Sequence, residues 1–481
     1  MPMYGSDPPL GMPAASRSSP LAVAPWRSRL VQPVSAASLA AFRVAFGLVM
    51  AWEAWRYLSY GWVRAYYVEP AFTFSYYGFE WVRPLPEPYL VAVFVGIGVC
   101  GVFVALGWAY RWAAALLAVG IAYVFLLEQA HYLNHVYLIV LLAGLLAVLP
   151  AARGYSLDAR AARQPRAPTV PAWTVWLLRF QVGLVYTFAA VAKMNPDWLA
   201  GEPVGTWVVE SAAGTPFEAL AAAPWAGRAV AWSGLALDLL AVPLLLWRRT
   251  RVAVTVALVV FHLSNAWLFH IGVFPWLMIL ALGIFYPPDW PLRLLGQRAA
   301  TASYSPPVRL APWAAVVLAA YVAVQLLLPL RHWLYPGDVA WTEEGHLYSW
   351  RMKLRDKSAT RAEFRVVDGA TGTEWTIGPE DVLTRRQARK MSTRPDMVLQ
   401  FAHRLAADAE AAGFKSAHVY ATVEASLNGH PPRPLIDPSV DLAAEPRSWR
   451  PKPWVVPFDA PPPVAERPEV TERPSQRAPT G

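Results

Sequence analysis

The sequence has few charged residues and a single cysteine. Asp, Glu, Lys and Arg make up 16% of its 481 residues, against about 25% in a typical soluble domain. Hydrophobic residues make up 56%, and the mean hydropathy is +0.30. A soluble protein of this length needs more polar surface than these residues supply. The composition therefore excludes a soluble globular enzyme and predicts an integral membrane protein.

The lone cysteine, Cys100, excludes an intramolecular disulfide and any cysteine-rich zinc or iron–sulfur site. A cleavable signal peptide is not visible either, because residues 1–34 are polar, rich in Pro, Ser and Ala, and contain no apolar core. We expect this tail to be disordered, and the first hydrophobic segment to direct membrane insertion.

Apolar stretches recur along residues 35–332 and predict a polytopic α-helical membrane domain of about nine transmembrane helices. Several stretches are shorter than the ~20 residues that cross about 30 Å of hydrocarbon. The stretches cover residues 36–58, 89–110, 112–128, 134–150, 173–193, 228–247, 252–266, 268–286 and 311–330.

The net charge of +9 comes from 42 Lys and Arg against 33 Asp and Glu. In a soluble protein this excess would suggest a nucleic-acid partner, but here the membrane topology explains it. With a cytoplasmic N-terminus, eleven arginines fall in inner loops and only Arg64, Arg83 and Arg228 in outer loops, which follows the positive-inside rule. We therefore expect no nucleic-acid partner, and we expect the chain after Leu330 on the non-cytoplasmic side.

Residues 337–457 have the pattern of a mixed α/β soluble domain. EFRVVDGATGTEWTI predicts a β-hairpin, and PDMVLQFAHRLAADAEAAG predicts a helix that ends at Gly413. HVYATVEASLNGHPPRP predicts a strand, a turn and an edge segment, because its prolines cannot pair in the centre of a sheet. Residues 458–481 are predicted to be disordered by composition.

Polar side chains inside apolar spans are costly, and they often mark functional sites. Lys193 ends one span, where a lysine commonly just extends its ammonium to the membrane interface. A desolvated ammonium would instead release its proton and act as a general base. In the nine-helix arrangement, Lys193, His135 and His262 all reach the outer ends of their spans. Because the three side chains lie at the same depth in the membrane, a common functional site is favoured.

Other polar residues in the spans leave more than one interpretation open. His131 and His135 share a helix face, as metal ligands do, but no third ligand is evident and no HEXXH motif is present, so we expect no metal. A histidine near a helix end is most often a packing residue. Asn265, nearly one turn after His262, could line the same cavity, and Arg43 needs an anionic partner or a polar cavity.

Four segments resemble the vitamin K-dependent gamma-glutamyl carboxylase family: LLEQAHYLNHVYL, YTFAAVAKMNPDWLAG, VVFHLSNAWLFHIGVF and WTEEGHLYSWRMKLRDKS. The resemblance runs from about Phe42 to Pro457. It implies a membrane enzyme that couples oxygenation of vitamin K hydroquinone (reduced menaquinone or phylloquinone) by O2 to carboxylation of peptide glutamate by CO2. Lipid, the quinol and a glutamate-containing peptide or protein are the implied partners.

The resemblance also implies roles for single residues. Lys193 matches the family's catalytic base, and His262 matches a further family histidine. Asn134, His135 and Tyr137 match an Asn-His-x-Tyr-Leu element that serves the carboxylation half-reaction. We therefore expect catalysis by Lys193, His135 and His262, and substrate binding by Asn134, Tyr137, Asn265 and Arg43.

The sequence also departs from the family. Ala192 stands where the family commonly has a first of two lysines, and animal members are longer and carry a disulfide that one cysteine cannot form. The Pro-, Arg- and Ala-rich termini suggest a bacterial inner-membrane protein. Two alternatives stay open: a quinol epoxidase of the same fold without protein carboxylation, and a non-enzymatic membrane transporter or binding protein.

Overall fold

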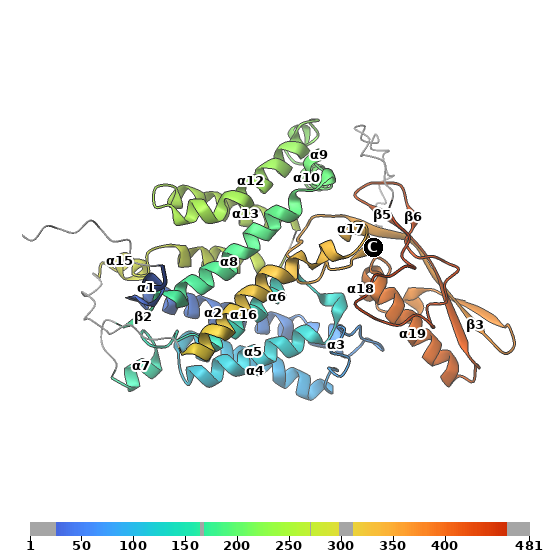
Figure 1. Cartoon of the computed structure of the whole chain (residues 1–481), viewed down its shortest axis with the longest axis horizontal. Helices are drawn as coiled ribbons and strands as arrows, with labels where there is room; N and C mark the ends of the chain where they lie inside the picture. The colour runs from blue at the N-terminus through green and yellow to red at the C-terminus, as the bar shows by residue number, and fades with distance from the viewer. Residues whose placement is uncertain (1–25, 164–167, 270, 298–310, 459–481) are drawn as a thin grey trace, which may run out of the picture.

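The computed structural model describes residues 26–163, 168–269, 271–297 and 311–458. Within these ranges, a helical region is followed by a domain that contains a β-sheet and lies at one end of the helices (Figure 1). Most of the two predicted tails lies outside the described residues.

Apolar helices form the first of these regions, where the sequence predicts them. Six are long and apolar enough to cross a membrane: α2 (Ala37–Ser59), α4 (Glu87–Leu106), α8 (Ala172–Lys193), α12 (Ala226–Leu246), α13 (Arg251–Phe269) and α16 with η3 (Pro312–Leu334). Three are shorter: α5 (Tyr110–Leu126), α6 (Asn134–Val148) and α14 with η2 (Phe274–Phe285). The prediction of a multi-pass membrane protein is confirmed by these apolar helices, whereas the number of nine transmembrane spans stays a prediction.

Short elements connect these helices. Near the start of the described chain, β1 (Pro33–Ser35) pairs with β2 (Thr169–Pro171) in an antiparallel ladder that brings the beginnings of α2 and α8 together. The sequence analysis did not predict this small sheet. The remaining short helices are α1 (Trp26–Val31), α3 (Trp62–Tyr67), η1 (Gln129–His131), α7 (Leu157–Ala161), α9 (Pro196–Ala200), α10 (Val204–Ala212), α11 (Glu218–Ala221) and α15 (Trp290–Leu294).

Helices α2 and α4 pack with their backbones in direct contact. A Cβ atom added to Gly47 would lie 2.4 Å from the carbonyl oxygen of Gly101, and one added to Gly101 would lie 2.8 Å from the backbone nitrogen of Ala51. Small residues allow such close approach between membrane helices, where dispersion contacts replace the hydrophobic effect as the driving force. The glycines therefore set the spacing of this pair.

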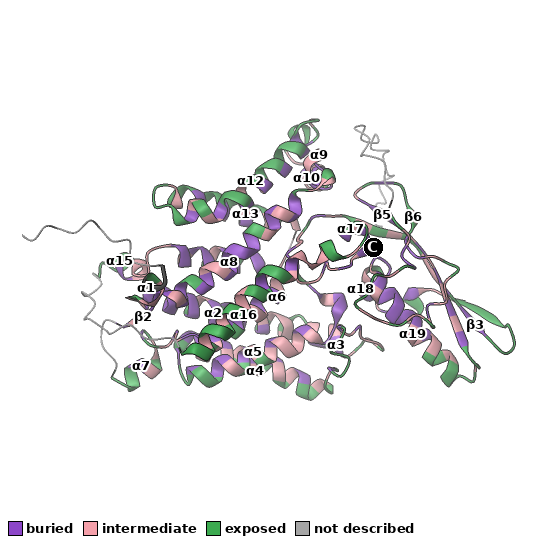
Figure 2. Cartoon of the chain, viewed as in Figure 1, coloured by how far each residue is buried: buried purple, intermediate pink, exposed green. Residues whose placement is uncertain are grey.

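Helix α8 lies at the centre of the bundle and α16 at its edge. In their most apolar windows, 67% of α8 residues are buried, but only 11% of those in α16 with η3 (Figure 2). Two hydrogen bonds hold α16 in place: Tyr321 donates to Gln181 on α8 (2.5 Å), and Gln325 donates to the Tyr137 hydroxyl on α6 (3.4 Å). Polar contacts of this kind stabilise helix association in lipid.

The C-terminal domain is built on a four-stranded antiparallel sheet in the order β4-β3-β5-β6. Its elements are α17 (Val339–Thr342), β3 (Lys357–Asp368), β4 (Glu374–Ile377), η4 (Pro379–Asp381), α18 (Arg385–Met391), α19 (Pro395–Ala411), β5 (Ala417–Leu427) and β6 (Arg433–Pro434). Alternate residues of β5 are buried, and α19 packs against this strand. The predicted hairpin, helix and edge strand are confirmed, and Gly413 has the positive φ of +104° expected after a helix end.

Polar contacts join the two regions. The Glu128 carboxylate accepts hydrogen bonds from the backbone N–H groups of Phe74 and Ala130 and from Nε2 of Gln387 on α18. Burial raises the pKa of Glu128 to about 7, although these hydrogen bonds and Arg394 oppose the increase. An ionised Glu128 therefore costs stability at this junction.

The topology can be tested by cysteine labelling. In a Cys100→Ser background, we expect Arg160→Cys and Glu410→Cys to react with a membrane-impermeant maleimide from opposite sides, because an odd number of spans separates α7 from α19. Labelling of both positions from the same side would show that the span count is wrong.

Glu128 should also make stability pH-dependent. A folded pKa of about 7 instead of 4.5 corresponds to about 3 kcal/mol. The protonated form is favoured in the folded state, so this stability is present below pH 4.5 and is lost as the pH rises to 7. We expect Glu128→Gln to lose this dependence in detergent-phase unfolding, whereas the exposed control Glu410→Gln should keep it. An unchanged profile in Glu128→Gln would contradict the assignment.

Candidate active site

Lys193 is the last residue of α8, and its side chain does not reach outward to the interface. The residue is 6% exposed, and Nζ donates a hydrogen bond to Oδ2 of Asp238 on α12, which is 3% exposed. The Trp198 ring centre lies 5.3 Å from Nζ, within cation–π range. The ammonium is thus held inside the protein by a carboxylate and an aromatic ring.

The sequence Asn-Pro-Asp-Trp after Lys193 explains how Trp198 reaches this position. Asn195 caps α9: its side chain accepts a hydrogen bond from the Trp198 backbone (3.0 Å) and donates one to the Ala192 carbonyl (2.9 Å). Nε1 of Trp198 donates to the Ala231 carbonyl on α12 (2.9 Å). The turn therefore closes the end of α8 and fixes the indole against α12.

The two candidate histidines both contact the ring of Phe274, at the start of α14. The His135 ring stacks on Phe274 at 5.6 Å, and the His262 ring meets it edge-on at 5.9 Å. Nε2 of His262 lies 2.7 Å from the Tyr186 hydroxyl, which is two turns before Lys193 on α8. His262 is 1% exposed, and its charge interaction with Lys193 shows that the two are close. The structure therefore brings Lys193, His262 and His135 together.

Asn134 and Tyr137 contact the segment that leads into the C-terminal domain. Asn134 accepts a hydrogen bond from the Tyr132 hydroxyl (2.9 Å) and donates one to the Arg351 carbonyl (3.2 Å). The Tyr137 ring lies 5.1 Å from that of Trp350. Both residues are buried next to the candidate site, and their contacts position the chain around residue 350.

Arg43 and Asn265 do not join this cluster in the same way. Arg43 is 1% exposed and donates to the carbonyls of Ala105, Ala151 and Tyr155. Ala105 is near the end of α4, and Ala151 and Tyr155 follow the C-terminal end of α6. Because α6 is about 20 Å long at a rise of about 1.5 Å per residue, its C-terminal end is remote from Asn134, where it starts. Backbone carbonyls thus give the guanidinium polar surroundings, one of the two environments that the sequence analysis expected for Arg43. Asn265 is half-buried one turn after His262, and has no hydrogen-bonding partner within the described ranges.

Asp238 is the site residue that the sequence analysis missed. It is the lone charged residue in the apolar run LALDLLAVPLLL, so the same criterion that selected Lys193 could have selected it. Tyr186 and Phe274 could not have been found this way, because nothing in the sequence separates them from ordinary packing aromatics. Among the residues that the structure describes, no group of three or more His, Cys, Asp or Glu could hold a metal ion.

A cavity of about 290 Å³ opens beside the last turn of α8. Its walls combine apolar side chains with His332 and Arg351, which reach it from η3 and from the start of the C-terminal domain. The apolar part of the wall includes Phe188, Ala192, Leu330 and Trp333. The cavity thus lies where α8, η3 and the segment that leads into the C-terminal domain meet.

Positive side chains gather at this meeting point. Arg355 forms an ion pair with Glu343. Burial by itself would raise the pKa of Glu343, but Arg355 and other nearby positive groups have the larger effect and lower that pKa to about 2. Burial lowers the pKa of Lys357 to about 7 and that of Arg351 to about 10. Lys390 and Arg394 from α18 and the turn after it add further positive charge. Such a concentration of cations attracts anionic ligands.

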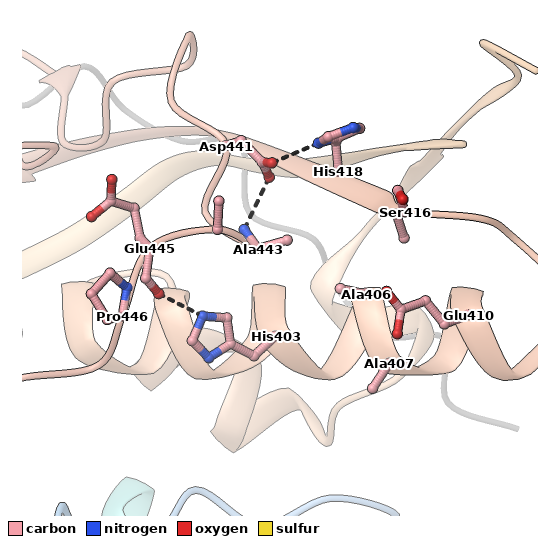
Figure 3. A pocket seen from close by; sticks show the side chains of 12 residues that line it. His403, Ala406, Ala407, Glu410, Ser416, His418, Asp441, Ala443, Glu445 and Pro446 are labelled. Atoms are coloured by element: carbon pink, nitrogen blue, oxygen red, sulfur yellow. Dashed lines mark hydrogen bonds and ion pairs between the residues drawn. The ribbon is translucent and has the colours of Figure 1, made fainter. Parts of the chain in front are cut away.

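A second, more open groove of about 540 Å³ lies on the C-terminal domain (Figure 3). Its polar groups bond to one another: Nδ1 of His418 lies 2.7 Å from Asp441, and Nε2 of His403 lies 2.9 Å from the Glu445 carbonyl. None of the predicted site residues lines it.

Two family models match the chain. The HTTM domain matches residues 31–290, more than half of the chain, and the lumenal domain of vitamin K-dependent gamma-carboxylase matches residues 310–461. The chain belongs to the vitamin K-dependent gamma-carboxylase family. No solved structure matches it. The boundary between the two family domains falls between η2 and α16, and Arg351 and Lys357 come from the carboxylase-type domain.

Family membership settles the coarser expectations. The chain is a membrane protein of a carboxylase family, and the presence of a lumenal-type domain supports a non-cytoplasmic C-terminal domain.

The Lys193–Asp238 pair should respond to mutation as a buried ion pair. Removing one partner leaves an uncompensated charge, so Asp238→Leu should lower the free energy of unfolding by about 3–5 kcal/mol. The double variant Lys193→Met/Asp238→Leu should recover most of this loss in detergent-phase unfolding. As a control, Arg404→Met/Asp408→Leu removes an exposed pair and should change stability by less than about 1 kcal/mol. If the double variant is no more stable than Asp238→Leu, the pairing is wrong.

Proposed function

We propose that this chain is a vitamin K-dependent gamma-carboxylase that couples oxygenation of vitamin K hydroquinone to carboxylation of a peptide glutamate. The observation that carries the proposal is the position of Lys193. In a chain of this family, the lysine that matches the family's base is buried beside Asp238 and close to His262, instead of extending to the interface. A membrane transporter or binding protein has no need of a base at this depth.

The residues present suit a quinol. Nδ1 of His262 is buried and has no hydrogen-bonding partner among the described atoms, so it is free to bond to a quinol hydroxyl. Phe274 and Trp198 offer flat apolar surfaces nearby. Leu330 and Trp333 of η3, which continues the exposed apolar helix α16, line the cavity beside α8, and this gives an isoprenoid tail a route from lipid.

Each residue then has a defined task. Lys193 takes the quinol proton at Nζ, and His262, held by Tyr186, orients the hydroxyl. Trp198 and the apolar walls exclude water, which strengthens electrostatic interactions and prevents side reactions. When bound, the cofactor supplies the basicity that removes a glutamate γ-proton, which no side chain can do at neutral pH. His135, which stacks on Phe274, serves the carboxylation half-reaction.

The cationic junction supports a glutamate-containing substrate. Arg351 belongs both to the cavity beside α8 and to the cluster with Arg355 and Lys357. A peptide carboxylate attracted to these cations would lie next to the end of α8. Asn134 fixes the Arg351 backbone and so helps to place this segment.

We further propose that all nine apolar helices cross the membrane, with the N-terminus in the cytoplasm. In this arrangement residues 35–332 form the catalytic membrane domain, and residues 337–457 form the soluble domain on the other side. The arginine distribution supports it.

The function can be tested directly on purified protein. Vitamin K hydroquinone, O2, labelled CO2 and a glutamate-containing peptide are supplied, and epoxide and incorporated label are measured separately. Both products are expected. Epoxide without label would favour a quinol epoxidase, and the absence of both would contradict the proposal.

Single variants separate the two half-reactions. Lys193→Ala should lower both epoxidation and label incorporation by about 10²–10⁴-fold, the usual contribution of a general base, because proton removal precedes both. His135→Ala should reduce label incorporation more than epoxidation. The exposed control Lys415→Ala should leave both unchanged. If folded Lys193→Ala forms epoxide at the wild-type rate, Lys193 is not the base and its role is structural.

A further inference from the structure

The contact between Lys193 and Asp238 conflicts with the task of a base. Nζ donates a hydrogen bond to Oδ2 of Asp238, so the nitrogen carries its proton on the side of the carboxylate. An ammonium has no lone pair with which to accept a proton from another group. Lys193 therefore needs somewhere to release a proton before or while it takes one.

We propose that Asp238 is the group that keeps this proton, so that Lys193 and Asp238 act together as one base. The proposal rests on the function proposed above. A proton leaves the quinol hydroxyl and bonds to Nζ, and a different proton leaves Nζ and bonds to Oδ2. One O–H bond breaks and one forms, Lys193 ends as the ammonium it was, and Asp238 becomes a neutral carboxylic acid. The negative charge passes from Asp238 to the quinol oxygen, beside the ammonium.

The surroundings of Asp238 make this exchange feasible. Asp238 is 3% exposed in an apolar helix, and Lys193 is its one ion-pair partner among the described residues. A buried carboxylate costs several kcal/mol in lost solvation, which a neutral acid does not. The net charge of the site is the same before and after the transfer, so no additional charge is buried.

Asp238 thus acts through Lys193 and is a positioning and proton-holding residue. Its hydrogen bond fixes Nζ at the end of α8, and Asp238→Asn keeps a similar shape but cannot take up a proton. Asp238→Glu keeps the carboxyl group and displaces it by one methylene. The two variants therefore separate proton uptake from simple positioning.

The first measurement needs no turnover. Under anaerobic conditions, infrared difference spectra are recorded while vitamin K hydroquinone is added to the full-length protein. Wild type should gain a carboxylic-acid carbonyl band, and Asp238→Asn should not, while its thermal unfolding in detergent and its quinol binding confirm a folded protein. The same band in Asp238→Asn, or no band in a wild type that forms epoxide in air, would overturn the proposal.

Kinetics give an independent test. Asp238→Asn should lower kcat for epoxide formation and for label incorporation by the same factor, about 10²-fold or more. The KM for quinol should stay within about twofold of wild type, and Asp238→Glu should restore part of the lost kcat.

The effects of residues that act as a unit are not additive, so Lys193→Ala/Asp238→Asn should be no slower than Lys193→Ala. A small amine should partly rescue Lys193→Ala but not the double variant. Additive losses, or equal rescue, would overturn the proposal. A wild type without epoxide would instead refute the proposed function.

Discussion

An ammonium and a carboxylate buried in an apolar domain must remain together, because either charge alone costs several kcal/mol. The contact between Lys193 and Asp238 therefore fixes the end of α8 against α12. The rest of the site depends on this alignment. It sets the position of Tyr186, two turns earlier on α8, and Tyr186 in turn holds the ring of His262 on α13. One ion pair thus determines how three helices meet at the candidate active site.

The second constraint is that the polar groups of the C-terminal domain and the apolar helices must meet without leaving buried polar groups unpaired. The C-terminal domain meets the membrane domain through hydrogen bonds from Asn134 to the Arg351 carbonyl and from Gln387 to Glu128. Asn428 of the β5–β6 turn also donates to Asp197, which follows Lys193 by four residues. The turn that closes the end of α8 is therefore held from the domain that supplies the cationic cluster.

Much of this organisation could be predicted from the sequence. The helices of the membrane domain follow from long apolar runs, and the hairpin, α19 and the edge strand follow from turn residues and periodicity, because these signals are local. Lys193, His135 and His262 could be selected because a polar group in an apolar run is costly wherever it lies. Asp238 carried the same signal, as a single charged residue in the middle of an apolar run, but its partner on another helix could not be predicted from that signal.

Other features were decided by the tertiary structure alone. Whether Lys193 extends to the interface or pairs inside the protein depends on which helix lies beside α8. The sequence alone does not show which helices are neighbours. Phe274 on α14 contacts two histidines that come from two other helices, and the carbonyl groups around Arg43 come from segments distant in the sequence. The sequence by itself determined which segments are helical and which side chains are costly to bury. Only the packing determined which of those side chains meet. The cost of burying a polar group is a property of the single residue, whereas the ion pair or hydrogen bond that offsets this cost needs a second residue in contact with it.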